Sequence, residues 1–173
     1  GHMAAALAHF PVKEIAQRVW DRYFVEGGKA PGAAFKSKPL SAVKPTKALV
    51  ELTVVANFVE VWLAKRGHEG LVGINLLEKI QLPTLPSLYG AMLAGVDVVL
   101  MGAGIPRAIP GLLDTLAAGE PAEMKIDLVG GEHTVTRFDP SQFGGRPLKR
   151  PQFFAIVSSA SLAQILVHKC TPP

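Results

Sequence analysis

The chain has 173 residues, of which 49% are hydrophobic and 18% are charged. This composition excludes a disordered chain, because disordered segments carry fewer apolar residues and more charge. The length suits one domain, so we expect residues 1–173 to form a single domain with a core of its own.

The net charge of +4 makes the chain mildly basic. Basic residues of this kind can meet phosphates or nucleic acid through electrostatic attraction. However, only 7% of the chain is aromatic, and no zinc-finger or RNP-like pattern is found. We therefore expect solvated loops and no nucleic-acid partner. The basic clusters are Lys36, Lys38, Lys44 and Lys47, and Arg146, Lys149 and Arg150.

The compartment is predicted from cysteine usage and from hydropathy. Cys170 is the single cysteine, so no disulfide can form within the chain, which fits a reducing compartment. The first residues lack the pattern of a signal peptide, and no apolar run approaches the roughly 20 residues of a membrane span. We expect a cytoplasmic protein with no membrane partner.

The first half of the chain is predicted to be mainly helical. Apolar residues recur at helical spacing from Pro11 to about Val25, and a Gly- and Pro-rich loop follows from Gly27 to Pro45. A long apolar helix then begins with Thr46 as its candidate N-cap and ends before Gly67. Most of that helix should be buried in the core.

Strands and helices alternate in the next segment. The apolar run Leu71 to Glu78 predicts a buried strand with Asn75 near its end. A helix follows that Thr84 can cap and Gly95 ends. Residues 96–101 predict a second strand, and Pro110 to Ala118 predict the next helix.

The last third adds a hairpin and a further strand and helix. Residues 124–138 alternate around Gly130 and Gly131, which predicts a β-hairpin, placed as an insertion at about residues 122–140. Residues 153–159 predict a third strand, followed by a helix from Ala160 to Lys169 that Ser158 or Ser159 can cap. With the hairpin set aside, the alternation predicts an α/β fold with parallel strands, in an open sheet or in a barrel.

The glycines in the stretch MGAGIPR, residues 101–107, raise the question of a dinucleotide-binding site. The Rossmann fingerprint G-x-G-x-x-G needs a third glycine, and Arg107 stands at that position. No acidic residue ends a following parallel strand at the usual distance, and Pro106 delays the helix. A tight turn between a strand and a helix is the better interpretation.

The carboxyl ends of the predicted strands are where α/β proteins bind ligands. Asn75, Met101, Gly102, Gly104 and Ser158 lie there. The Asn75 amide needs hydrogen bonds, which a polar cofactor edge or the neighbouring backbone can provide. Ser158 has helix capping as its structural alternative.

No catalytic constellation is found elsewhere. His9, His68, His133 and His168 have no partner at metal-ligand spacing, so each is expected to be a surface residue. Neither a nucleophile elbow nor a P-loop is present. The residues themselves indicate an α/β domain with an unassigned site.

Several long phrases carry a family resemblance. Residues 54–114 contain VANFVEVWLAKRG, GINLLEKIQLPTLPSLYG and GVDVVLMGAGIPRAIPGLLD, and residues 150–166 read RPQFFAIVSSASLAQIL. Together with HMAAALAHFP and DRYFVEGGKAP upstream, these resemble the nitronate monooxygenase family, formerly called 2-nitropropane dioxygenases. The similarity is to the branch near the trans-acting enoyl reductases of polyunsaturated fatty acid synthesis, and it covers nearly the whole chain.

The resemblance implies part of an FMN-dependent TIM (β/α)8 barrel that oxidises alkyl nitronates with O2. It implies that FMN lies at the carboxyl ends of the strands, beside Asn75, beside the loop with Met101, Gly102 and Gly104, and beside Ser158. The implied substrate is a small molecule, either a nitronate or, for the enoyl reductase alternative, an enoyl thioester.

Departures from the family pattern are equally specific. A closed barrel needs about 250 residues, and the family's first-strand glycine-methionine phrase, catalytic histidine and phosphate-binding glycines have no match in this chain. The chain therefore resembles an internal fragment with no catalytic residue of its own, expected to be inactive by itself. Its open barrel edges predict a homo-oligomer. A non-catalytic binding or assembly module is the third alternative.

Overall fold

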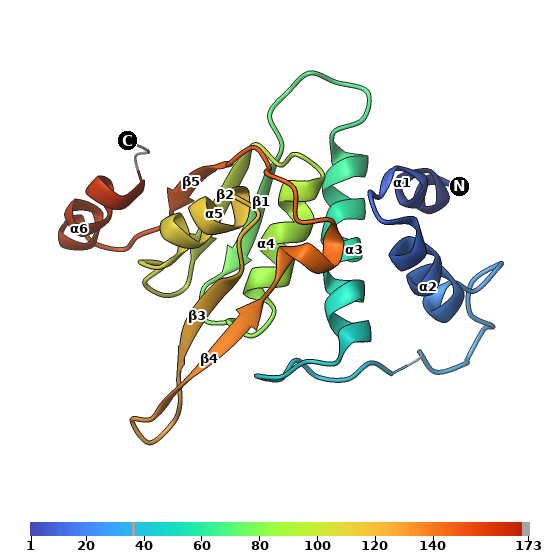
Figure 1. Cartoon of the computed structure of the whole chain (residues 1–173), viewed down its shortest axis with the longest axis horizontal. Coiled ribbons are helices and arrows are strands. Elements are labelled where there is room, and N and C mark those ends of the chain that lie inside the picture. Colours follow the sequence, from blue (N-terminus) through green and yellow to red (C-terminus); the bar gives the residue numbers. More distant parts are fainter. Residues whose placement is uncertain (36, 171–173) are drawn as a thin grey trace.

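The computed structural model describes residues 1–35 and 37–170 (Figure 1). Lys36, and the side chains of His168 and Cys170, lie outside the described part of the chain. The helices are α1 (His2–His9), α2 (Lys13–Tyr23), α3 (Lys47–Ala64), α4 (Thr84–Leu93), α5 (Ile109–Ala117), the 3-10 turn η1 (Pro140–Phe143) and α6 (Ala160–Cys170). The strands are β1 (Gly73–Leu77), β2 (Val98–Gly102), β3 (Ala122–Asp127), β4 (His133–Phe138) and β5 (Gln152–Ala155).

The predicted parallel sheet and hairpin are both confirmed. Strands β1, β2 and β5 form a three-stranded parallel sheet in that order, and β3 and β4 form a separate antiparallel pair. In the register of the parallel sheet, Asn75 lies beside Leu100, and Leu100 lies beside Phe154. No closed barrel forms among the described residues, so β1 and β5 are both edge strands.

One face of the parallel sheet is buried under helices. Ile74, Leu76, Met101 and Phe153 belong to the core or pack against it, whereas their neighbours along each strand point the other way. The strand order follows the chain, so successive right-handed crossovers put their helices on the same side. Figure 1 shows the resulting order of layers: the sheet, then α4, then α3, then α1 and α2.

Helix α4 is the centre of the core, because all of its residues are buried. Gly90 lets it approach α3 closely. A Cβ atom added at Gly90 would lie 3.0 Å from the Cα atom of Val54 and closer still to the Val54 carbonyl oxygen. These are backbone atoms of α3 that cannot move aside independently. Helices α3 and α4 can therefore lie this close together only with glycine at position 90.

Helices α1 and α2 cover the outer side of α3. Phe10 meets Phe58 edge to face with ring centroids 5.1 Å apart. The Arg18 guanidinium donates to both carboxylate oxygens of Glu51, from Nη2 over 2.6 Å and from Nε over 3.2 Å. Helix α2 was predicted, but α1 was not, because its alanine-rich sequence has no clear amphipathic period. The burial of Ala6 in the tertiary structure stabilises it.

The hairpin packs on the helix layer rather than on the sheet. Its inward side chains include Met124 and Phe138, and Phe138 joins Phe143 around the ring of Tyr89. The Tyr89 hydroxyl is buried without a hydrogen-bond partner among the described residues, and this burial raises its pKa. The aromatic cluster fixes the hairpin against the α4 side of the core.

Of the two threonines predicted to cap helices, one does so and the other does not. Thr46 caps α3 as expected, since its Oγ1 accepts a hydrogen bond from the Leu49 N–H over 3.3 Å. Thr84 does not cap α4: Pro83 is the N-cap, and the Thr84 hydroxyl donates to the Ile80 carbonyl over 3.1 Å. A threonine inside the first turn often bonds backward in this way.

Asp97 ties the amino ends of the strands together. Its Oδ2 accepts from Lys65 Nζ over 2.5 Å and from the Val72 N–H over 3.0 Å, while Lys149 Nζ lies 3.7 Å from Oδ1. Its carbonyl accepts the N–H of Gln152. The end of α3 and the starts of β1, β2 and β5 thus meet at Asp97, through its carboxylate and its backbone carbonyl.

We predict that Gly90→Ala destabilises the fold by about 3 kcal/mol or more, because the added methyl group overpacks a helix crossing. Gly111→Ala is the matched control: it also lies in a helix, but its Cβ would meet nothing within 4 Å. There alanine should stabilise the fold by about 0.5–1 kcal/mol. Urea denaturation followed by circular dichroism measures both. Equal effects of the two substitutions would contradict the close crossing.

We predict that Asp97→Asn costs about 1–3 kcal/mol at pH 7. The hydrogen bonds from Lys65 and Val72 lower the pKa of Asp97. The stability that the carboxylate contributes is therefore full above the unfolded pKa of about 3.9 and is lost as pH falls through the lower folded pKa. The stability difference between wild type and variant should narrow from pH 7 to pH 3. Asp127→Asn, an exposed control at the end of β3, should change little at either pH.

Candidate functional site

The candidate site lies on the uncovered face of the parallel sheet. The side chains of this face come from alternate positions of β1, β2 and β5, with Ile156 just beyond β5. Leu77, Phe154 and Ile156 are 43%, 52% and 51% exposed. Parallel sheets are normally buried on both faces, so an exposed apolar face of this kind marks a surface that binds something. Its other members are Gly73, Asn75, Val98, Leu100, Gly102 and Gln152.

Asn75 lies on this face, in the middle of β1 rather than near its end. Its side chain is exposed, and among the described residues it has no hydrogen-bond partner. The alternative in which the Asn75 amide bonds to neighbouring backbone is therefore wrong. The register places it in one row with Leu100 and Phe154 across the sheet. An unpaired amide beside two apolar side chains can recognise a flat ligand that has a polar edge.

Met101 and Gly102 follow one another in β2 and therefore face opposite sides. The Met101 side chain is fully buried in the core on the helix side, so it does not reach the open face. Gly102 lies on the open face, where an added Cβ would be 2.9 Å from the Cβ of Ile156. Gly102 thus leaves room for Ile156. Met101 and Gly102 are both buried, so neither of them presents a side chain at the strand ends.

Gly104 lies in the loop that follows β2, next to Glu78. An added Cβ at Gly104 would lie 2.9 Å from the Cβ of Glu78 and would overlap its carboxylate. Ala103 adopts a left-handed φ of 57°, which a non-glycine residue rarely takes. Because α5 begins only at Ile109, the loop does not deliver a glycine to a helix N-terminus. The interpretation of MGAG as part of a strand-to-helix connection is confirmed, but the predicted tight turn is wrong, because residues 103–108 separate β2 from α5.

Glu78 is a site residue that sequence reasoning missed. It follows β1, its N–H donates to the Gly102 carbonyl over 2.8 Å, and its Oε1 accepts from Gln81 Nε2 over 2.9 Å. The sequence does contain a signal for it: Glu78 is a carboxylate just after a predicted strand, and the neighbouring predicted strand ends in glycines at the same edge. The structure brings Glu78, Gly102 and Gly104 to one end of the sheet, and Asn75 lies further back, in the middle of β1.

Ser158 is exposed in the connection between β5 and α6. The helix cap is its neighbour: Ser159 Oγ accepts a hydrogen bond from the Leu162 N–H over 3.2 Å. The prediction that Ser158 or Ser159 caps this helix is therefore confirmed for Ser159. The Ser158 hydroxyl is left facing solvent beyond the strand end.

His9, His68 and His133 lie away from the open face. His9 bonds the Ala5 carbonyl over 2.8 Å and His68 bonds the Ala64 carbonyl over 2.7 Å, each within its own helix or helix end. His133 is exposed at the start of β4 in the hairpin. These contacts are structural. Among the described residues, no group of three His, Cys, Asp and Glu side chains lies close enough to hold a metal ion.

The open face fits one part of FMN better than another. An apolar row ending in the Asn75 amide suits the isoalloxazine ring, which has two flat faces and a polar edge. The strand ends are less suited to the phosphate, because Glu78 brings negative charge there and its side chain fills the space beside Gly104, although Lys79 and Arg107 are exposed in the same two loops. The residues therefore fit the ring of FMN better than its phosphate.

Comparison with known proteins gives no relative: no family model, no curated protein and no solved structure matches the chain. Within residues 1–35 and 37–170, no helix has both the length and the apolar character needed to cross a membrane.

Proposed function

We propose that this chain supplies a flavin-binding face to an FMN-dependent oxidoreductase of the nitronate monooxygenase type. The observation that carries the proposal is the row of Asn75, Leu100 and Phe154 on a parallel sheet whose opposite face packs against the core. Part of a TIM barrel has the same arrangement, with parallel strands in chain order and helices on one side of them. In such barrels the ligand lies at the carboxyl ends of the strands. The phrases in residues 54–114 support the same class of protein.

The residues take distinct roles in this proposal. The Asn75 amide donates to and accepts from the polar edge of the flavin ring, and Leu100 with Phe154 excludes water from its face. Bound FMN supplies the two-electron redox chemistry. The small-molecule substrate is an alkyl nitronate, and an enoyl thioester is the alternative within the same fold. The nitronate is already an anion, so its oxidation requires no base from Asn75, Glu78 or Ser158.

FMN titration tests the proposal through the visible absorption spectrum of the flavin. We expect the wild-type chain to shift the flavin bands with a saturable dependence on protein, without any requirement for turnover. Asn75→Ala should weaken binding about tenfold, because one hydrogen bond to a polar ring edge is worth about 1–1.5 kcal/mol. Asn57→Ala, on α3 behind the core, is the matched control. Absence of a shift, or equal affinities of Asn75→Ala and wild type, would exclude the flavin site.

The second candidate is a non-catalytic assembly module. The observation in its favour is the exposure of Leu77, Phe154 and Ile156 together on one face, beside the edges of β1 and β5. Large apolar patches and unpaired strand edges are typical of interfaces. In this case a second copy of the chain covers the open face.

The assembly candidate predicts a discrete dimer in solution without added flavin. Phe154→Lys should convert that dimer to monomer, because a charge in the middle of an apolar interface is costly to desolvate. Val129→Lys, on the fully exposed hairpin tip, removes a comparable apolar side chain elsewhere and should leave the mass unchanged. Size-exclusion chromatography with light scattering reads the mass. A wild-type monomer would rule this candidate out.

A further inference from the structure

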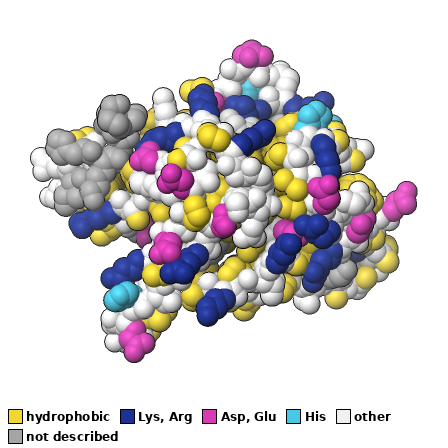
Figure 2. Space-filling model, viewed as in Figure 1, with side chains coloured by type: hydrophobic (Ala, Val, Ile, Leu, Met, Phe, Trp, Pro, Cys, Tyr) yellow, Lys and Arg dark blue, Asp and Glu magenta, His cyan; other side chains and the backbone are white. Residues whose placement is uncertain are grey.

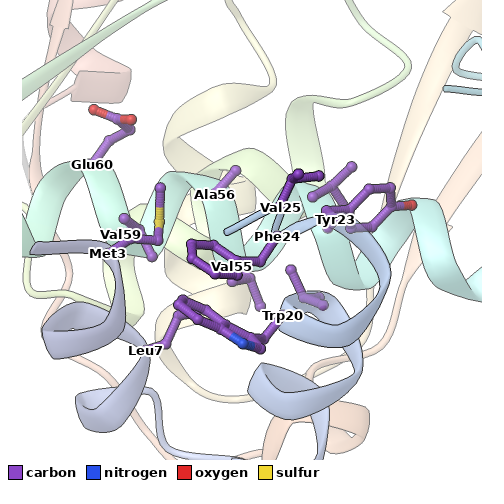
Figure 3. A pocket seen from close by; sticks show the side chains of 12 residues that line it. Met3, Leu7, Trp20, Tyr23, Phe24, Val25, Val55, Ala56, Val59 and Glu60 are labelled. Carbon is purple, nitrogen blue, oxygen red and sulfur yellow. The ribbon is translucent and has the colours of Figure 1, made fainter. Parts of the chain in front are cut away.

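A second binding surface lies on the other side of the molecule, between α1, α2 and α3. It is an apolar cavity of about 250 Å³ (Figure 3). Leu7 comes from α1, Trp20 from α2, and Val55 and Val59 from α3, with Phe24 just after α2. Helices α3 and α4 separate this cavity from the open sheet face, as Figure 1 shows. It is therefore independent of the flavin proposal.

The cavity is too large to be a packing defect. An apolar cavity of about 150 Å³ already holds a benzene molecule in an engineered core. The rings of Trp20 and Phe24 stack with centroids 3.7 Å apart and form one rigid wall. The mouth is accessible, because Met3, Phe24 and Val25 are about half exposed. The cavity thus suits an apolar chain that enters from solvent.

A basic groove adjoins the cavity. This groove has a volume of about 440 Å³ and shares Val19 and Tyr23 with the cavity. Its charged side chains are Arg18, Arg22, Lys47 and Glu51. Lys38 adds a further cation from the long loop, with Nζ 5.1 Å from the centroid of the Tyr23 ring.

Charge decides which end of a ligand meets the groove. Glu51 accepts hydrogen bonds from Arg18 and also lies 3.9 Å from Lys47 Nζ. One carboxylate therefore stands beside three cations in the lining, and the groove keeps a net positive charge. Figure 2 shows several Lys and Arg side chains on the α2 and α3 side of the molecule, with Asp and Glu side chains among them. In Figure 3, Glu60 and Tyr23 mark opposite ends of the cavity. An anionic group is therefore attracted to the Tyr23 end and repelled from the Glu60 end.

We propose that this surface binds an anionic amphiphile, namely a medium-length acyl chain with a free carboxylate. The acyl chain fills the cavity between Trp20 and Val59, and the carboxylate lies in the groove beside Tyr23, within reach of Lys47 and Arg22. Burial of the chain supplies most of the affinity. The charge-assisted contacts set the orientation.

Quenching of tryptophan fluorescence by ω-bromodecanoate, below its micelle concentration, tests the proposal. The chain has two tryptophans, and Trp62→Phe leaves Trp20 as the reporter in the cavity wall. We expect saturable quenching of Trp20 and competition by unlabelled decanoate. Ala56→Phe places a ring in the cavity from an exposed position of α3 and should abolish the quenching. Circular dichroism verifies that each variant keeps its helical content.

Two comparisons isolate the carboxylate. Lys47→Gln should weaken decanoate binding about tenfold, whereas Lys125→Gln, an exposed cation on the hairpin, should leave it unchanged. Decanol should bind more weakly than decanoate to the wild type and should not respond to Lys47→Gln. Linear, non-saturable quenching would overturn the site. Equal binding of decanol and decanoate would overturn the assignment of the anionic end.

Discussion

The close crossing of α3 and α4 at Gly90 is the constraint on which the rest of the structure depends. Helix α4 is buried on every side, so whatever surrounds it must fit its surface. The sheet lies on one side, α3 on the other, and the hairpin aromatics around Tyr89 complete the enclosure. The short distance at Gly90 brings α3 into this layer, and α3 in turn provides the floor on which α1 and α2 pack.

The arrangement of the helices relative to the sheet leaves the molecule with two different exposed surfaces. Successive crossovers in one direction place the helices on one face of the sheet and leave the row of Asn75, Leu100 and Phe154 uncovered. On the opposite side, the splayed contact of α1 and α2 with α3 leaves the apolar cavity beside Trp20. The first surface is a sheet face with an amide on its edge strand, and the second is an apolar cavity with a basic groove at one end. The two can therefore take ligands of different shape and charge.

Part of the candidate site was predictable because strand ends follow from local pattern. Gly102 ends an apolar run, and parallel strands bring their carboxyl ends to one edge. Asn75 was predicted near a strand end but lies in the middle of β1. Met101 looked equivalent to Gly102 in sequence, but alternation along β2 turns its side chain into the core. The pairing of Gly104 with Glu78 could not be predicted, because it depends on how two loops from different strands approach one another. The basic groove combines Arg18 with Lys47 for the same reason: a long loop separates them in the chain.

The sequence by itself determined the elements that depend on short-range periodicity and turn residues. These are α2, α3, the alternating strands and helices, and the hairpin at Gly130 and Gly131. Only the tertiary structure decided that α1 is helical, that Thr84 bonds backward and that no barrel closes among the described residues. Local pattern fixes which backbone hydrogen bonds a segment can form with itself. Which face is then buried, and against what, depends on contacts between residues far apart in the chain, and a single sequence does not contain that information in its local pattern.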